Sequence, residues 1–107
     1  MPHYTAPLRD MQFVLFDLLQ AESELAALPR HAGLDRETIE AVLEEGARFA
    51  SQVIQPLNQV GDREGCTWHG DGVVTAPPGF KAAYRQYVEN GWPSVSCDPD
   101  WGGQGLP

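Results

Sequence analysis

Hydrophobic positions recur with helical spacing most clearly in the middle of the chain. Apolar side chains and one glycine follow one another at steps of three and four, namely Ile39, Val42, Leu43, Gly46, Phe49, Ala50, Val53, Ile54 and Leu57. This stripe predicts one helix of about twenty residues with a single buried face. Asp35 is the expected N-cap, because its carboxylate can accept from the free amides of the first turn. Pro56 should kink or end the helix, and Gly46 predicts close packing against a neighbour.

Two further helices have shorter stripes. The first is predicted near the N-terminus by apolar side chains on one face, Met11, Leu15, Leu18 and Leu19, with Asp10 as its N-cap. A short helical segment over residues 22–28 follows it and should end at Pro29. The other helix is predicted from Pro78 to Asn90, with a buried face of Phe80, Tyr84, Tyr87 and Val88. Gly91 fits the left-handed position that follows a helix.

The rest of the chain lacks helical periodicity. Residues 61–79 are rich in glycine and proline, which predicts a loop with at most a short hairpin pairing residues 66–68 with residues 73–75. Residues 91–107 are rich in glycine, proline and tryptophan. The fold class is therefore all-α: three main helices plus a short helix, with a long aromatic-rich loop. The sequence ends without a terminal helix or polar tail, and we expect an incomplete helical domain whose stripes pack together and against something further.

Composition narrows the possible functions. The 107 residues include 7 basic and 15 acidic side chains, a formal net charge of −8. Such a surface repels nucleic acid and anionic lipid, whereas ten aromatic residues argue against disorder. Cys66 and Cys97 form neither a CxxC pair nor a disulfide framework, which is typical of a reducing cytosol. We find no signal peptide or membrane span and expect a soluble, cytoplasmic protein.

Candidate chemistry is sparse. Cys66-x-x-His69 resembles half of a zinc site, but the other ligands would have to come from Cys97 and His31 or His3, which form no second close pair. An ordinary thiol and imidazole are the better interpretation, and we assign no metal ligand.

Two glycine-containing segments could also be sites. Gly102-Gly103-Gln104-Gly105 could cradle a phosphate, but no strand precedes it and no Lys-Ser/Thr follows, so a turn with positive φ angles is favoured. The carboxylates of Asp62 and Glu64 between two glycines fit a charged, exposed turn after the long helix. Four further glutamates, Glu37, Glu40, Glu44 and Glu45, fit a solvated helix face with a Glu44–Arg48 pair. We therefore identify no catalytic residue and cannot assign cofactor-binding residues.

A series of short motifs in fixed order nevertheless resembles a known family. It consists of Pro56-Leu57-Asn58, Gly61-Asp62-Arg63-Glu64-Gly65, Pro78-Gly79-Phe80-Lys81, Tyr84, Gly91-Trp92, and Pro99 followed by Gly102-Gly103-Gln104-Gly105-Leu106-Pro107. Together these are similar to the N-terminal helical region of acyl-CoA dehydrogenases. The opening residues, Tyr4-x-Ala6-Pro7-x-x-Asp10-Met11-x-Phe13, resemble the large subgroup with an extended N-terminus, which includes methylthiopropanoyl-CoA dehydrogenase-like enzymes.

The resemblance implies an FAD-dependent parent that α,β-dehydrogenates an acyl-CoA thioester, with its carboxylate base and most flavin contacts outside this chain. It implies N-terminal extension helices over residues 1–34 and a truncated helical domain over residues 35–107. The expected partners are the remainder of the dehydrogenase chain, acyl-CoA in the parent and further copies in a homo-oligomer. Residues 1–107 alone would bind no cofactor and act as an inactive scaffold. The alternative is a stand-alone helical interaction module that uses Trp68, Trp92 and Trp101. A small acyl-CoA-binding protein is weaker, because only seven basic residues are available.

Overall fold

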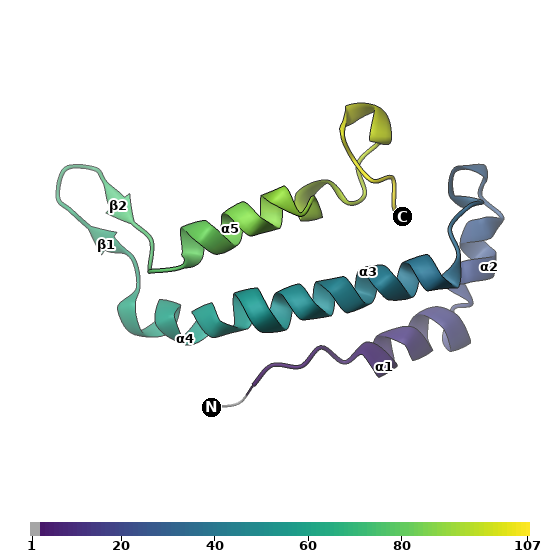
Figure 1. Cartoon of the computed structure of the whole chain (residues 1–107), viewed down its shortest axis with the longest axis horizontal. Helices are drawn as coiled ribbons and strands as arrows, with labels where there is room; N and C mark the ends of the chain where they lie inside the picture. The colour runs from purple at the N-terminus through teal and green to yellow at the C-terminus, as the bar shows by residue number, and fades with distance from the viewer. Residues whose placement is uncertain (1–2) are drawn as a thin grey trace.

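A computed structural model describes residues 3–107, and most of these residues lie in helices. They lie in three rows (Figure 1), with one long rod in the middle, α5 along one side and α1 along the other. The rod is built from α3 (Arg36–Phe49), the π-helical segment η3 (Ala50–Ile54) and α4 (Gln55–Glu64). The predicted all-α class is confirmed.

The central rod begins as predicted but ends later. The Thr38 amide donates to Asp35 Oδ1 at 2.8 Å, which confirms the N-cap. Of the two outcomes expected at Pro56, a kink or an end, the end is wrong, because α4 continues to Glu64. A proline breaks a regular helix by lacking an N–H and by crowding the carbonyl four residues earlier. The wider π-helical turn of η3 immediately before Pro56 relieves both constraints.

The N-terminal row also differs from the prediction at its boundaries. It comprises α1 (Leu8–Gln12), the π-helical η1 (Phe13–Leu18), α2 (Ala21–Ala26) and the 3₁₀-helix η2 (Pro29–His31). Asp10 is not the N-cap, because Pro7 occupies that position and starts the helix earlier. Asp10 instead lies in the first turn, where its charge still favours the helix dipole. The short second helix ends before Pro29, as expected, and Pro29 opens the following 3₁₀ turn.

The remaining elements follow the sequence pattern closely. Strands β1 (Thr67–Trp68) and β2 (Val74–Thr75) form the expected antiparallel hairpin, and α5 (Phe80–Glu89) begins two residues after Pro78. Gly91 has a φ of +79°, which confirms the left-handed position after α5. Two 3₁₀ turns complete the chain, η4 (Trp92–Ser94) and η5 (Pro99–Trp101).

The small core lies where α5 and η4 cover the rod. The Phe49 ring lies 6.2 Å from the Tyr87 ring and 6.3 Å from the Trp92 ring, measured between centroids. A Cβ on Gly46 would lie 3.6 Å from the Trp92 indole, so this glycine is covered, as its place in the stripe predicts. The two stripes therefore meet as expected. The prediction that the α5 stripe is buried is wrong, because its four side chains are all exposed: Phe80, Tyr84, Tyr87 and Val88.

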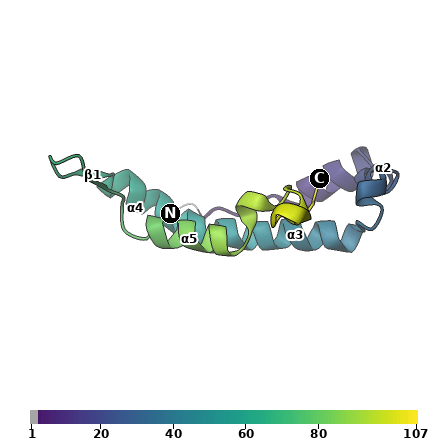
Figure 2. The same ribbon diagram turned by 90° about the horizontal axis from the view of Figure 1, so that it is seen from above.

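The molecule is a thin, arched layer rather than a sphere (Figure 2). It measures 56 × 37 × 16 Å, and its radius of gyration of 17.8 Å exceeds the roughly 13 Å expected for a compact chain of this length. Its accessible surface of 7921 Å² compares with roughly 5,900 Å² for a compact protein of the same mass. Among the described residues, only Phe16, Pro77 and Ala83 are buried. A single layer of helices leaves most apolar side chains half-covered.

Candidate functional site

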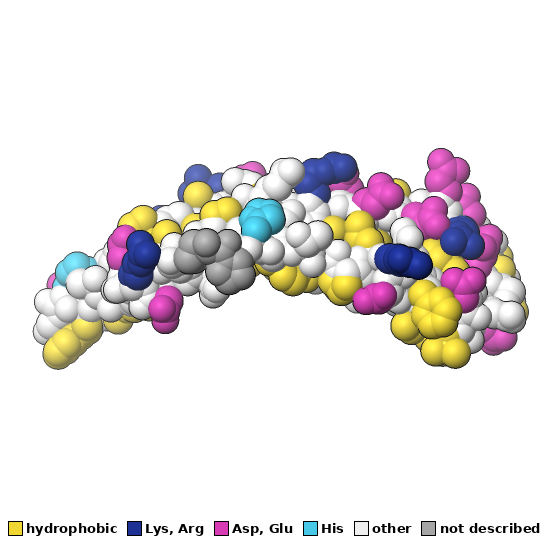
Figure 3. Space-filling view, turned by 90° about the horizontal axis from the view of Figure 1, so that it is seen from below, with side chains coloured by type: hydrophobic (Ala, Val, Ile, Leu, Met, Phe, Trp, Pro, Cys, Tyr) yellow, Lys and Arg dark blue, Asp and Glu magenta, His cyan; other side chains and the backbone are white. Residues whose placement is uncertain are grey.

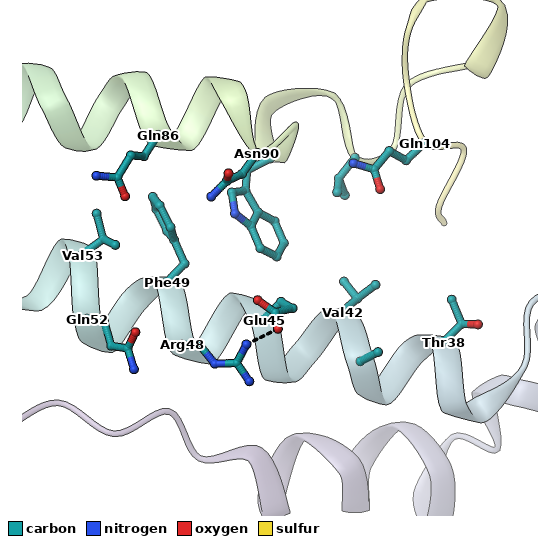
Figure 4. A pocket seen from close by; sticks show the side chains of 13 residues that line it. Thr38, Val42, Glu45, Arg48, Phe49, Gln52, Val53, Gln86, Asn90 and Gln104 are labelled. Carbon is teal, nitrogen blue, oxygen red and sulfur yellow. Dashed lines mark hydrogen bonds and ion pairs between the residues drawn. The ribbon is translucent and has the colours of Figure 1, made fainter.

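A groove of about 550 Å³ runs between the rod and α5 and reaches the C-terminal loop. Figure 4 shows Phe49 and Val53 rising from the rod toward Gln86 and Asn90, which point down from α5. The apolar lining combines two aromatic rings with smaller side chains: Phe49, Trp92, Ala41, Val42, Val53 and Val95. The polar lining includes four side-chain amides, Gln52, Gln86, Asn90 and Gln104. The buried Nε1 of Trp92 has no hydrogen-bond partner. Side-chain amides and an indole N–H can hydrogen-bond to neutral, polar partners such as a peptide backbone.

The groove offers little for catalysis. Its ionisable lining residues are Glu45 and Arg48, which form an ion pair with each other across one turn (Figure 4). Arg48 therefore pairs with Glu45 rather than with the predicted Glu44. Both side chains of the pair are more than half exposed, so solvent weakens the pair. General acid–base chemistry needs a group shielded from solvent, and neither member of this pair is shielded.

The glycine-rich C-terminal loop is a closed turn. The amides of residues 102–106 donate in order to the carbonyls of Pro99, Asp98, Ser94, Cys97 and Val95, over 2.9–3.2 Å. Gly102 and Gly105 have φ angles of +85° and +65°, which confirms the predicted turn. A phosphate cradle needs free amides, and the loop uses these amides internally. The candidate phosphate site is therefore ruled out.

The zinc candidates lie on separate elements. His69 Nε2 lies 2.6 Å from Thr75 Oγ1 across the hairpin, and Cys66 directly precedes β1. Cys97 lies beyond η4, His31 in η2 and His3 near the N-terminus. Over residues 3–107, no three His, Cys, Asp or Glu side chains come together as a metal-binding group.

The carboxylate candidates are surface groups. Asp62 and Glu64 are exposed, but they lie in the last turn of α4 rather than in a turn after it, which corrects the prediction. The four glutamates of α3 are exposed or half-exposed, as expected for a solvated face.

Two side chains at the start of α3, Asp35 and Arg36, have a pKa that departs from its ordinary value. Glu40 accepts a hydrogen bond from Arg36 at 2.8 Å and raises the pKa of that guanidinium. Arg36 also lies 4.3 Å over the Phe16 ring, a cation–π contact that ties the N-terminal row to the rod. The hydrogen bonds from Thr38 lower the pKa of Asp35. These contacts stabilise the helix start and do not point to a reaction.

The three tryptophans do not form one surface. Trp68 is 71% exposed in the hairpin and Trp101 is 89% exposed in η5, and these elements lie toward opposite ends of the layer (Figure 1). Trp92 is half-covered beside Phe49. The glycines and prolines around each tryptophan in the sequence do not indicate which of the three is covered.

No helix over residues 3–107 is both long and apolar enough to cross a bilayer.

Comparison with known proteins gives the chain its context. No protein-family model matches it. It is 39% identical over 104 residues to the 3-methylmercaptopropionyl-CoA dehydrogenase of Ruegeria pomeroyi, which covers 97% of this chain and 17% of that protein. It is 29% identical over 111 residues to a broad-specificity linear acyl-CoA dehydrogenase of Mycobacterium tuberculosis, covering 100% of this chain and 18% of that protein. The resemblance seen in the motifs is confirmed, and the chain spans about one sixth of these relatives' length.

Proposed function

Because its curated relatives are acyl-CoA dehydrogenases, we propose that the chain is the N-terminal helical region of an FAD-dependent acyl-CoA dehydrogenase. The observation that carries the proposal is similarity along nearly the whole chain to about one sixth of each of two such enzymes. The thin helical layer supports it, since a layer with half-covered apolar faces is suited to packing within a larger protein.

The role proposed for this region is scaffolding. Its groove lacks a shielded acid or base, and the amides of its glycine loop bond internally, so these residues do not fit the flavin phosphates or the proton-abstracting step. We assign the base and the flavin contacts to the remainder of the parent. Residues 1–34 would form the N-terminal extension and residues 35–107 the start of the helical domain. The amide-lined groove would receive a segment from the rest of the dehydrogenase chain, because the side-chain amides can form hydrogen bonds with the backbone of such a segment.

For the parent, the proposal includes FAD as cofactor, an acyl-CoA thioester as substrate, α,β-dehydrogenation as the reaction and a homo-oligomeric state. The cysteine usage supports a cytoplasmic location. Its two relatives are named for different thioesters, so the acyl group is left open.

The alternative is a stand-alone interaction module. The exposed Trp68 and Trp101 favour it, since aromatic side chains are enriched at interfaces. Their separation weakens it, because hot spots cluster near the centre of an interface.

The test compares residues 1–107 with the polypeptide encoded by the complete reading frame. Both are purified, incubated with FAD, desalted and examined for flavin absorbance at about 350–500 nm. We expect the longer polypeptide to retain flavin and to bleach on addition of methylthiopropanoyl-CoA or a linear acyl-CoA, with residues 1–107 colourless. A reading frame that stops at Pro107 would contradict the fragment interpretation, and flavin reduction by residues 1–107 would contradict the scaffold role.

A further inference from the structure

The N-terminal row is held on the rod mainly at one point. Phe16 in η1 is the only buried side chain among residues 3–34. The Arg36 guanidinium of α3 lies 4.3 Å from the centre of the Phe16 ring. The row also reaches the C-terminal loop through an ion pair between Arg30 and Asp98 at 3.5 Å, but both of these side chains are about half exposed, so solvent weakens the pair. One ring against one cation is therefore the main specific contact.

On either side of Phe16, the row leaves unfilled space against the rod. A cavity of about 480 Å³ is lined by residues 3–8 of the row and residues 44–51 of the rod. A second cavity, of about 210 Å³, lies between η1 and α2 on one side and α3 on the other, and all of its lining side chains are apolar. Because protein interiors contain few voids larger than a water molecule, the row does not pack on the rod as a core element does.

Charge also opposes close packing of the row. Residues 3–34 carry two basic and four acidic side chains, and α3 carries the same numbers, so each has a net charge of −2. Figure 3 shows acidic side chains gathered over the end where α1 and α2 lie. Surfaces of like charge repel, and Arg36 is the cation that joins them. Its hydrogen bond to Glu40 and the charges of Asp17 and Glu22 in the row raise the pKa of this guanidinium.

The other side of the rod is held differently, because α5 is fixed near both of its ends. Grooves lie between the rod and α5 as well, but close contacts flank them. Beyond the C-terminal end of α5, the aromatic core packs on the rod. At its N-terminal end, a Cβ on Gly61 would lie 2.7 Å from the Phe80 ring, and one on Gly79 would lie 2.6 Å from Leu57. Two points of attachment prevent α5 from pivoting, whereas the row has one.

The connection between the row and α3 can serve as a hinge. Residues 32–35 join η2 to α3 outside any helix, and a Cβ on Gly33 would meet no atom within 4 Å. Hinges are a few loop residues of this kind, which absorb the change in backbone angles. We propose that the N-terminal row is a strap that opens from the rod as one unit about residues 32–35, while the rod and α5 stay together. Phe16 against Arg36 is the contact that keeps the strap closed.

Opening of the strap uncovers an apolar part of α3. Ile39 and Leu43 are half-covered and line the apolar cavity beneath the row, so they enter water when the row moves away. The row is therefore a cover for this part of the rod, and its local stability is lower than that of the rod and α5. The inference concerns residues 3–107 alone and does not rest on the dehydrogenase assignment.

The test is amide hydrogen exchange of residues 1–107 under native conditions. The amides of η1 and α2 should share one opening reaction and exchange at least roughly tenfold faster than those of α5 and the middle of α3. Phe16→Ala should speed exchange in the row by roughly ten- to a hundredfold and leave α5 unchanged. Leu18→Ala is the matched control, because Leu18 is 65% exposed in the same element, and it should have little effect.

A second pair of variants tests the cation. Arg36→Gln removes the charge over the Phe16 ring and should speed exchange in the row by roughly two- to fivefold, whereas Arg36→Lys keeps a cation there and should have a smaller effect. Arg63→Gln removes an exposed cation from α4, on a different part of the rod, and should leave exchange in the row unchanged.

Three results would overturn the proposal. One is equal protection of the row and α5 in the unmodified chain, which would show a single cooperative unit. Another is a Phe16→Ala protein that speeds exchange in α5 as much as in the row, or that loses most of its helix by circular dichroism. The third is an equal effect of Leu18→Ala and Phe16→Ala. None of these measurements involves flavin, so the dehydrogenase assignment keeps its own test.

Discussion

Two glycine- and tryptophan-rich segments of this chain look alike in sequence and behave differently in structure. The hairpin at residues 66–75 projects beyond the helices, with Trp68 and Val74 exposed (Figure 1). The C-terminal segment at residues 92–107 folds back on itself through a run of backbone hydrogen bonds, and its first residue, Trp92, packs on Phe49. Irregular sequence is therefore no guide to whether a segment is fixed or projecting. The two segments differ because the C-terminal one makes backbone hydrogen bonds within itself and packs a ring on the rod, whereas the tryptophan of the hairpin is exposed.

The glycines should show this contrast most strongly. A Cβ at Gly103 would lie 2.0 Å from the Cys97 carbonyl oxygen, which also accepts from the Gly105 amide and so cannot easily move. We expect Gly103→Ala to lower the free energy of unfolding by about 3 kcal/mol. Gly72→Ala in the hairpin meets open space at a φ of +86° and should cost about 1 kcal/mol. Urea unfolding followed by circular dichroism measures both, and equal losses would remove the distinction.

The tryptophans give the next largest difference. Trp92→Ala removes a half-buried ring from the aromatic core and should cost about 2 kcal/mol. Trp68→Ala removes a ring that is largely in water and should change stability by less than about 0.5 kcal/mol. Trp92→Phe keeps a ring and removes the unpaired Nε1 donor, so it should be closer to neutral than Trp92→Ala. A larger effect at Trp68 in the same unfolding assay would show that the hairpin is packed after all.

Two helical glycines extend the contrast into the rod. A Cβ on Gly46 would meet Trp92 at 3.6 Å, an ordinary contact, so Gly46→Ala should stabilise the chain by up to about 1 kcal/mol through helix propensity. A Cβ on Gly61 would lie 2.7 Å from the Phe80 ring, and this clash should cancel the same gain. Thermal unfolding of the two variants compares them directly, and a similar rise in both would show that Phe80 moves away freely.

The smallest expected effect is the contribution of Asp35 to the loss of stability at low pH. The Thr38 hydrogen bonds hold the pKa of Asp35 below its ordinary value, so the folded state binds this proton more weakly than the unfolded one. The stabilisation is present above the ordinary pKa of about 4 and is lost as the pH falls through the lower folded value. Asp35→Asn should cap about as well at neutral pH and show a smaller loss of helix on acidification. Identical acid titrations of the two proteins would exclude this role for Asp35.

Sequence reasoning succeeded where the signal was local. The periodic stripes located all three main helices, Asp35 marked the start of the rod, and Gly91 marked the end of α5. It failed where one local rule competed with another. Pro56 predicted a kink or an end to the helix, but the π-helical turn before it let the rod continue. Pro7 moved the start of the first helix ahead of Asp10.

The candidate sites were predictable only as residue types. The motif order alone identified the family resemblance, and the glycine loop was expected to be a turn. Whether its amides were free depended on Ser94, Val95 and Cys97 lying opposite them. The amide-lined groove was missed, because Gln52, Gln86 and Gln104 come from three separate segments with no shared motif.

By itself, the sequence determined the helices, the acidic charge and the similarity to acyl-CoA dehydrogenases, because hydrophobic spacing and motif order are properties of the chain. Only the tertiary structure decided that the helices form a thin layer and that one tryptophan is packed while two are exposed. It also decided that the apolar side chains of α5 that the sequence predicted to be buried are exposed. Periodicity identifies which face of a helix is apolar, whereas the neighbour that covers this face comes from elsewhere in the chain or from another molecule.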